Sequence, residues 1–64
     1  MSTLMPLVHQ ARRTIRNRRD GNPFATDAVI ADLIEALSTA YLAAPNDRVS
    51  RTIKVELDHL ETLI

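Results

Sequence analysis

The sequence predicts an all-α fold, either a small three-helix bundle or a helical hairpin with an N-terminal helix, completed by homodimerisation. Apolar residues recur at helical spacing in three segments. Two polar breaks separate these segments, at residues 20–23 and 44–47, and each contains a proline. The chain has 64 residues and no cysteine, so disulfides cannot supplement its core. We therefore treat residues 1–64 as one domain with helices at residues 3–19, 23–44 and 47–63.

The first predicted helix, residues 3–19, has an apolar stripe and a basic side. The stripe is formed by Leu4, Val8, Ala11 and Ile15. At about 100° per residue, Arg12, Arg16 and Arg19 gather roughly a quarter of a turn away from it. His9 lies beside these arginines. Arg18 falls on the apolar side near the helix end, where it can extend outward along its own methylene groups.

The two breaks predict how neighbouring helices end and begin. Gly21 can adopt the left-handed conformation that follows many helix ends. Asn22 can cap a second helix that begins at Pro23, and Thr26-Asp27 offers a rival start one turn later. After the second break, the polar residues at 46–47 can cap the third helix in the same way.

The second predicted helix, residues 23–44, has the best-defined apolar face. The face is formed by Ile30, Leu33, Ile34, Leu37, Ala40, Tyr41 and Ala44. We expect both aromatic residues, Phe24 and Tyr41, to pack into the core, with Phe24 covering the end of the bundle. Leu42 points away from the main stripe, on a side that is rich in small and polar residues.

In the third predicted helix, residues 47–63, the apolar positions fit two patterns. Helical spacing relates Val49, Ile53, Leu57, Leu60 and Ile64. Residues 51–57, however, alternate polar and apolar as a strand does, and this alternation resembles the N-terminal strand of ribbon-helix-helix repressors. In that family two helices follow the strand, whereas only seven residues follow here. A helix is therefore the better prediction, with Val55 on its outer side.

The apolar stripes of three helices exceed what so short a chain can easily bury, because a domain of this size buries only about 60% of its unfolded surface. We therefore expect a second copy of the chain to complete the core. The residues predicted to form the core or the self-association face are Ile30, Leu33, Ile34, Leu37, Tyr41, Val49, Ile53, Leu57 and Leu60.

Charge divides the chain into a basic start and an acidic remainder. Residues 1–19 hold five arginines and no acid, whereas residues 20–64 hold all eight acids and the other three bases, a net charge of −5. The predicted partner-binding residues are Arg12, Arg13, Arg16, Arg18 and Arg19. A cluster of this kind meets something acidic: nucleic acid, another protein or the chain's own acids. Those acids are Asp27, Asp32, Glu35, Asp58 and Glu61.

The sequence favours a protein without enzymatic activity. Its serines lie in no nucleophile motif, and a single glycine excludes a phosphate-cradling loop. Glu56 and His59 have the Glu-x-x-His spacing of di-iron bundles, but facing helices supply no matching glutamates. We therefore predict no metal, no cofactor and no small-molecule substrate. We expect no membrane span, and a chain without cysteine suits the cytoplasm.

The function predicted from these features is that of a small helical regulatory or inhibitor protein that binds another protein and forms a homodimer. The first alternative is RNA or DNA binding through the arginine-rich helix, because arginine donates paired hydrogen bonds to phosphate. In composition, residues 10–19 resemble the arginine-rich helices of viral RNA-binding proteins. The second alternative is a structural subunit of a larger complex.

Overall fold

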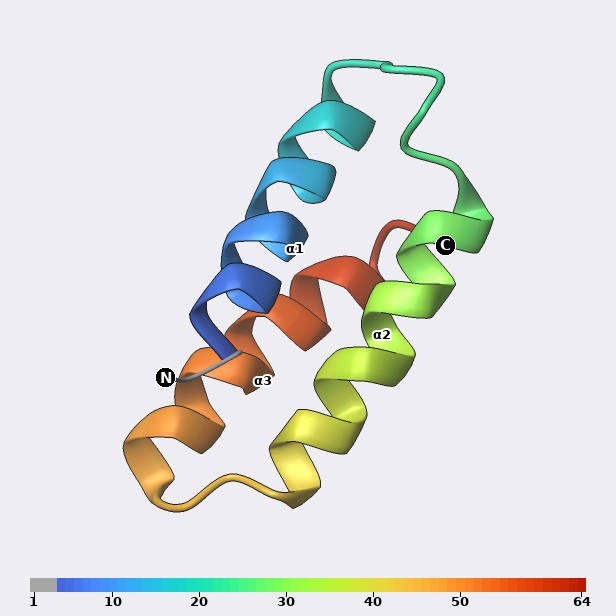
Figure 1. Cartoon of the computed structure of the whole chain (residues 1–64). Coiled ribbons are helices and arrows are strands. Elements are labelled where there is room, and N and C mark those ends of the chain that lie inside the picture. Colours follow the sequence, from blue (N-terminus) through green and yellow to red (C-terminus); the bar gives the residue numbers. More distant parts are fainter. Residues whose placement is uncertain (1–3) are drawn as a thin grey trace.

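The structure, a computed structural model, describes residues 4–64 and has three α-helices. These are α1 (Leu4–Arg19), α2 (Asp27–Leu42) and α3 (Asp47–Glu61), and the described residues contain no strand. In Figure 1, α1 and α3 both run upward, and α2, which lies between them in the sequence, runs downward. Each helix contacts the other two. The all-α prediction is therefore confirmed as a three-helix bundle, and residues 51–57 are helical as expected.

The turn between α1 and α2 differs from the predicted one. Gly21 has a φ of 80° and follows the end of α1, as expected. Asn22, however, caps no helix, because its Oδ1 accepts a hydrogen bond from the Phe24 amide at 2.9 Å and so closes a local turn. Helix α2 begins at Asp27 instead, where the Thr26 hydroxyl accepts from the Val29 amide at 3.3 Å. The predicted start at Pro23 is wrong, and the rival start is the one observed.

The remaining helix ends lie within a few residues of the predictions. Asn46 caps α3, since its Oδ1 accepts from the Val49 amide at 3.0 Å. Helices α2 and α3 end at Leu42 and Glu61, each two residues before the predicted end. The predicted start of the first helix, residue 3, lies outside the described residues. None of the described helices has the length and apolarity needed to cross a membrane.

The core closes within one copy of the chain. The buried cluster consists of Ala11, Ile15, Ile30, Leu33, Leu37, Ile53, Leu57 and Leu60. Ile34 and Val49 are half-buried against it. The stripes of all three helices contribute to this cluster, although Tyr41 and Ile64 of the predicted stripes stay exposed. The cluster is buried within one copy of the chain, and the homodimer stays a prediction.

Neither aromatic side chain is buried as predicted. Tyr41 is 41% exposed and lies in a hollow with polar residues of the first turns of α3, Ser50, Arg51 and Lys54. Phe24 is 83% exposed, because α2 starts three residues later and leaves Phe24 in the turn, off the apolar face of the helix. The buried hydrophobic side chains of residues 4–64 are therefore all aliphatic.

Candidate partner-binding face of helix α1

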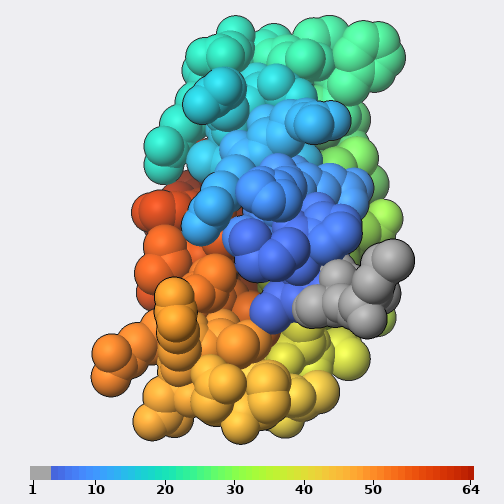
Figure 2. All heavy atoms as spheres, turned by 60° about the vertical axis from the view of Figure 1, so that its left-hand side comes forward, coloured from blue at the N-terminus to red at the C-terminus, as the bar shows by residue number. Residues whose placement is uncertain are grey.

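Four of the five clustered arginines form an exposed surface on α1. We call Arg12, Arg13, Arg16 and Arg19 the arginine face, and all four are exposed. In Figure 2, α1 forms the front of the molecule and α3 lies alongside it. Arg12, Arg16 and Arg19, with Ile15 and Asp20, line an open hollow of about 370 Å³ on this side of the bundle.

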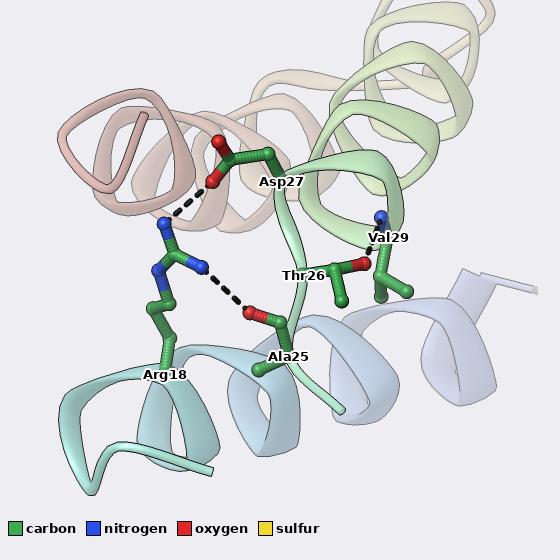
Figure 3. A network of polar contacts seen from close by, with 5 residues as sticks. All are labelled: Arg18, Ala25, Thr26, Asp27 and Val29. Carbon is green, nitrogen blue, oxygen red and sulfur yellow. Dashed lines mark hydrogen bonds and ion pairs between the residues drawn. The ribbon is translucent and has the colours of Figure 1, made fainter. Parts of the chain in front are cut away.

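The fifth arginine, Arg18, holds the turn between α1 and α2 together (Figure 3). Its Nη1 donates to the carbonyl oxygen of Ala25 at 2.9 Å, and its Nη2 lies 2.5 Å from Oδ1 of Asp27. Its position on the apolar side of α1 directs the guanidinium toward the start of α2, rather than outward into solvent as predicted. Arg18 is thus a structural residue, and the predicted pairing of the cluster with Asp27 is confirmed for this arginine alone.

A buried glutamate holds Arg12. The Arg12 Nε donates to Oε1 of Glu56 at 3.2 Å, and this bond joins α1 to α3. The Glu56 side chain is only 5% exposed, whereas that of Arg12 is 54% exposed. Oε2 of Glu56 is buried and accepts no hydrogen bond. Burial of a charged group with one oxygen unpaired is costly, so Arg12 and Glu56 depend on each other.

The sequence did not point to Glu56 as the partner of Arg12, although a signal was present. Glu56 lies on one side of α3 with Ile53, Leu57 and Leu60, all of which are buried. Helical spacing therefore places Glu56 on the core side of α3. The interpretation of Glu56 and His59 as possible metal ligands did not take this burial into account. His59 is exposed, and no group of three or more metal-ligating side chains comes together within residues 4–64.

The other arginines of this face lack acidic partners. Across residues 4–64, Arg13, Arg16 and Arg19 form no ion pair. The acids Asp32 and Glu35 on α2 likewise form none and are exposed. The third ion pair is local to α3, where Lys54 Nζ lies 3.1 Å from Oδ1 of Asp58. The hydrogen bond and the charge of Asp58 raise the pKa of Lys54 above its ordinary value.

Most of the predicted self-association residues are buried or half-buried inside the chain, whereas the arginine face is exposed. Comparison with protein families identifies no family model that matches the chain, and neither curated proteins nor solved structures give a significant match. The functional proposal therefore depends on the chemistry of this surface.

Proposed function

We propose that this chain is a small, non-enzymatic regulatory or inhibitor protein that binds an acidic surface of another protein through the arginine face of α1. The observation that carries the proposal is that Arg13, Arg16 and Arg19 are exposed and form no ion pair with any acid of residues 4–64. Arginines with structural duties, such as Arg18, are satisfied by the chain itself. The three free arginines have no comparable role in the fold.

A protein suits this surface better than a nucleic acid for two reasons. Met5 is 47% exposed on the same side of α1, one helical repeat from Arg12, and methionine and arginine are both enriched at protein interfaces. In addition, the acids of the remaining chain reduce the net charge to zero. That balance weakens the long-range attraction to a polyanion, while it leaves a local basic surface for a local acidic one.

Homodimer formation is part of the proposal, although the core does not require it. Leu42 is 87% exposed at the end of α2, and Val55 on α3 is half-exposed. We propose that Leu42, the most exposed large apolar side chain of residues 4–64, lies in the contact between copies. Sedimentation equilibrium tests this point, because a dimer doubles the 7.2 kDa mass of one chain. A mass that stays at one chain over the whole concentration range contradicts it.

The binding proposal is tested by capture of partners from the native cell with two matched variants. Arg13→Gln/Arg16→Gln removes two charges from the arginine face, and Arg48→Gln/Arg51→Gln removes two exposed charges from α3. We expect a stoichiometric acidic protein that is lost with the first variant and retained with the second. Equal capture by both variants contradicts the proposal. Capture of a fixed multi-protein assembly indicates the structural subunit instead.

Nucleic-acid binding is the second candidate, because Arg12, Arg16 and Arg19 line one hollow at the surface of the bundle. With four contacts to phosphate, the logarithm of the affinity falls with the logarithm of salt at a slope of about −3 to −4. A mobility shift of RNA and DNA with salt titration measures that slope. Absence of a shift at low salt eliminates this candidate. For both candidates we propose the cytoplasm, where disulfides are rare and a chain without cysteine forms none.

A further inference from the structure

Helix α1 carries a second regular stripe besides its apolar one. Its members alternate at spacings of four and three residues along the whole helix, and all are exposed. We call them the α1 stripe: Met5, His9, Arg12, Arg16 and Arg19. Spacing of this kind keeps one row of side chains facing a neighbouring helix, as in helices that pack side by side.

Helix α2 carries an exposed stripe with the same spacing. We call its members the α2 stripe: Ala28, Asp32, Glu35, Thr39 and Leu42. It includes the two acids of α2 that form no ion pair within residues 4–64, and it ends on the most exposed large apolar residue, Leu42. Its small members, alanine and threonine, let a second helix approach closely.

The two stripes are complementary when they are laid antiparallel. Arg12 then faces Glu35, and Arg16 faces Asp32. Met5 faces Leu42, so the exposed apolar residues of the two helices also meet. His9 and Arg19 face the uncharged residues Thr39 and Ala28. In the parallel arrangement Arg16 faces Thr39 and Arg19 faces Leu42, so only the antiparallel one pairs two arginines with acids and the two apolar residues with each other.

We propose that the α1 stripe of one copy binds the α2 stripe of a second copy in this antiparallel register. The inference rests on the proposed function, because it assigns residues of the arginine face and Leu42 to the homodimer contact that the proposal includes. It also assigns a role to the opposite charges of residues 1–19 and of the remaining chain. Leu42, which has no role in the core, contacts Met5 of the second copy.

The bond between Arg12 and Glu56 prepares Arg12 for this contact. Oε1 of Glu56 accepts a hydrogen bond from the Arg12 Nε at 3.2 Å, and this bond fixes the guanidinium on the α3 side of α1. The two terminal nitrogens of Arg12 form no hydrogen bond with Glu56, and more than half of the side chain is exposed. Those nitrogens can donate a pair of parallel hydrogen bonds to a further carboxylate, which is Glu35 of the second copy in the proposed register.

The stripes lie on different sides of the bundle, so the contact joins copies head to tail. The α1 stripe turns toward α3, as the bond from Arg12 to Glu56 shows. The α2 stripe turns toward α1, because Asp32 lines a groove with Leu7 and Gln10. A pair of copies joined by one such contact keeps one free stripe on each copy. The dimer of the proposed function is then the first step of an association that can add further copies.

Charge reversal at one pair of positions tests the register. Sedimentation equilibrium at low salt compares the wild-type protein with Arg16→Glu and with Asp32→Arg. Each single reversal places like charges opposite each other, and we expect the dissociation constant to rise about tenfold. An equimolar mixture of the two variants, or the double variant, restores opposite charges at every contact. Both are expected to associate as the wild type does.

The control is Arg51→Glu, which makes the same charge change at an exposed position of α3. It is expected to leave association unchanged, and circular dichroism confirms that each variant is folded. A wild type that stays monomeric, single variants that associate normally, or a double variant that stays weak each overturns the inference. The proposed function fails separately, in the capture experiment, if loss of Arg13 and Arg16 leaves the partner bound.

Discussion

Removal of Arg12 and removal of Glu56 are expected to have very different effects on the free energy of unfolding. In Arg12→Ala, Glu56 remains buried with neither oxygen hydrogen-bonded, since Oε2 already lacks a donor. Stranding a fully buried charge costs about 3–5 kcal/mol. Because the Arg12 side chain is 54% exposed, water can reach Oε1 after truncation, and we reduce the expected cost to about 2 kcal/mol.

Substitution of Glu56 instead removes the buried charge that Arg12→Ala leaves unpaired. Glu56→Met replaces the carboxylate with an unbranched apolar side chain of similar length, and Arg12 turns to water without loss of burial. The unpaired Oε2 disappears with the carboxylate. The stability of Glu56→Met is therefore expected to lie within about 1 kcal/mol of the wild type, because apolar replacement of buried ion pairs is often neutral or stabilising.

Thermal unfolding followed by circular dichroism at neutral pH measures the difference. For a domain of this size about 1 kcal/mol shifts Tm by roughly 4–8 °C, so Arg12→Ala should lower Tm by roughly 8–16 °C. Arg13→Ala, at an exposed arginine without an acidic partner, serves as the control and should change stability by less than about 0.5 kcal/mol. A loss for Glu56→Met as large as that for Arg12→Ala would refute the reasoning.

Three further predictions concern the turn and α3. Arg18→Gln removes the bonds to Ala25 and Asp27 and should cost about 1 kcal/mol. Amide hydrogen exchange at the start of α2 should become faster than in the wild type, and exchange in α3 should change less. Gly21→Ala meets no neighbouring atoms but is held at a φ of 80°, so urea unfolding should show a loss of about 1 kcal/mol. Asp58→Asn should lower the raised pKa of Lys54, measured by NMR titration. Because that pKa is raised by folding, its contribution is complete at neutral pH and is lost only as alkaline pH passes the lysine's titration, so Asp58→Asn should flatten the alkaline part of the stability profile.

Helical periodicity was sufficient to predict the core of this protein, because the same spacing that defines each helix also selects its buried side. Ile30, Leu37, Ile53 and Leu60 are fully buried as expected. The start of α2 was harder to predict, since Asn22 and Thr26 both have side chains that can accept a backbone hydrogen bond. Only the local geometry decided that Asn22 closes a turn and Thr26 caps the helix.

The candidate site was predictable as a set of arginines but not as a set of roles. Arg18 and Arg12 are bound by Asp27 and Glu56, residues nine and 44 positions away, and sequence spacing alone does not show which arginine pairs with which acid. Apolar spacing also did not show which stripe residues the bundle covers. Most members of the three stripes are buried or half-buried, but Tyr41 and Ile64 stay exposed, as do Leu42 and Val55 off the stripes.

The central claim is that the exposed arginines of α1 bind the acidic stripe of a second copy, and dilution of the protein followed by NMR tests it most directly. Amide chemical shifts recorded from about 1 mM to about 20 μM report weak contacts, which have dissociation constants in this range. The account predicts shifts confined to Met5–Arg19 of α1 and to Ala28–Leu42 of α2, with α3 unchanged. Shifts concentrated in α3, or their absence from α1, would contradict it.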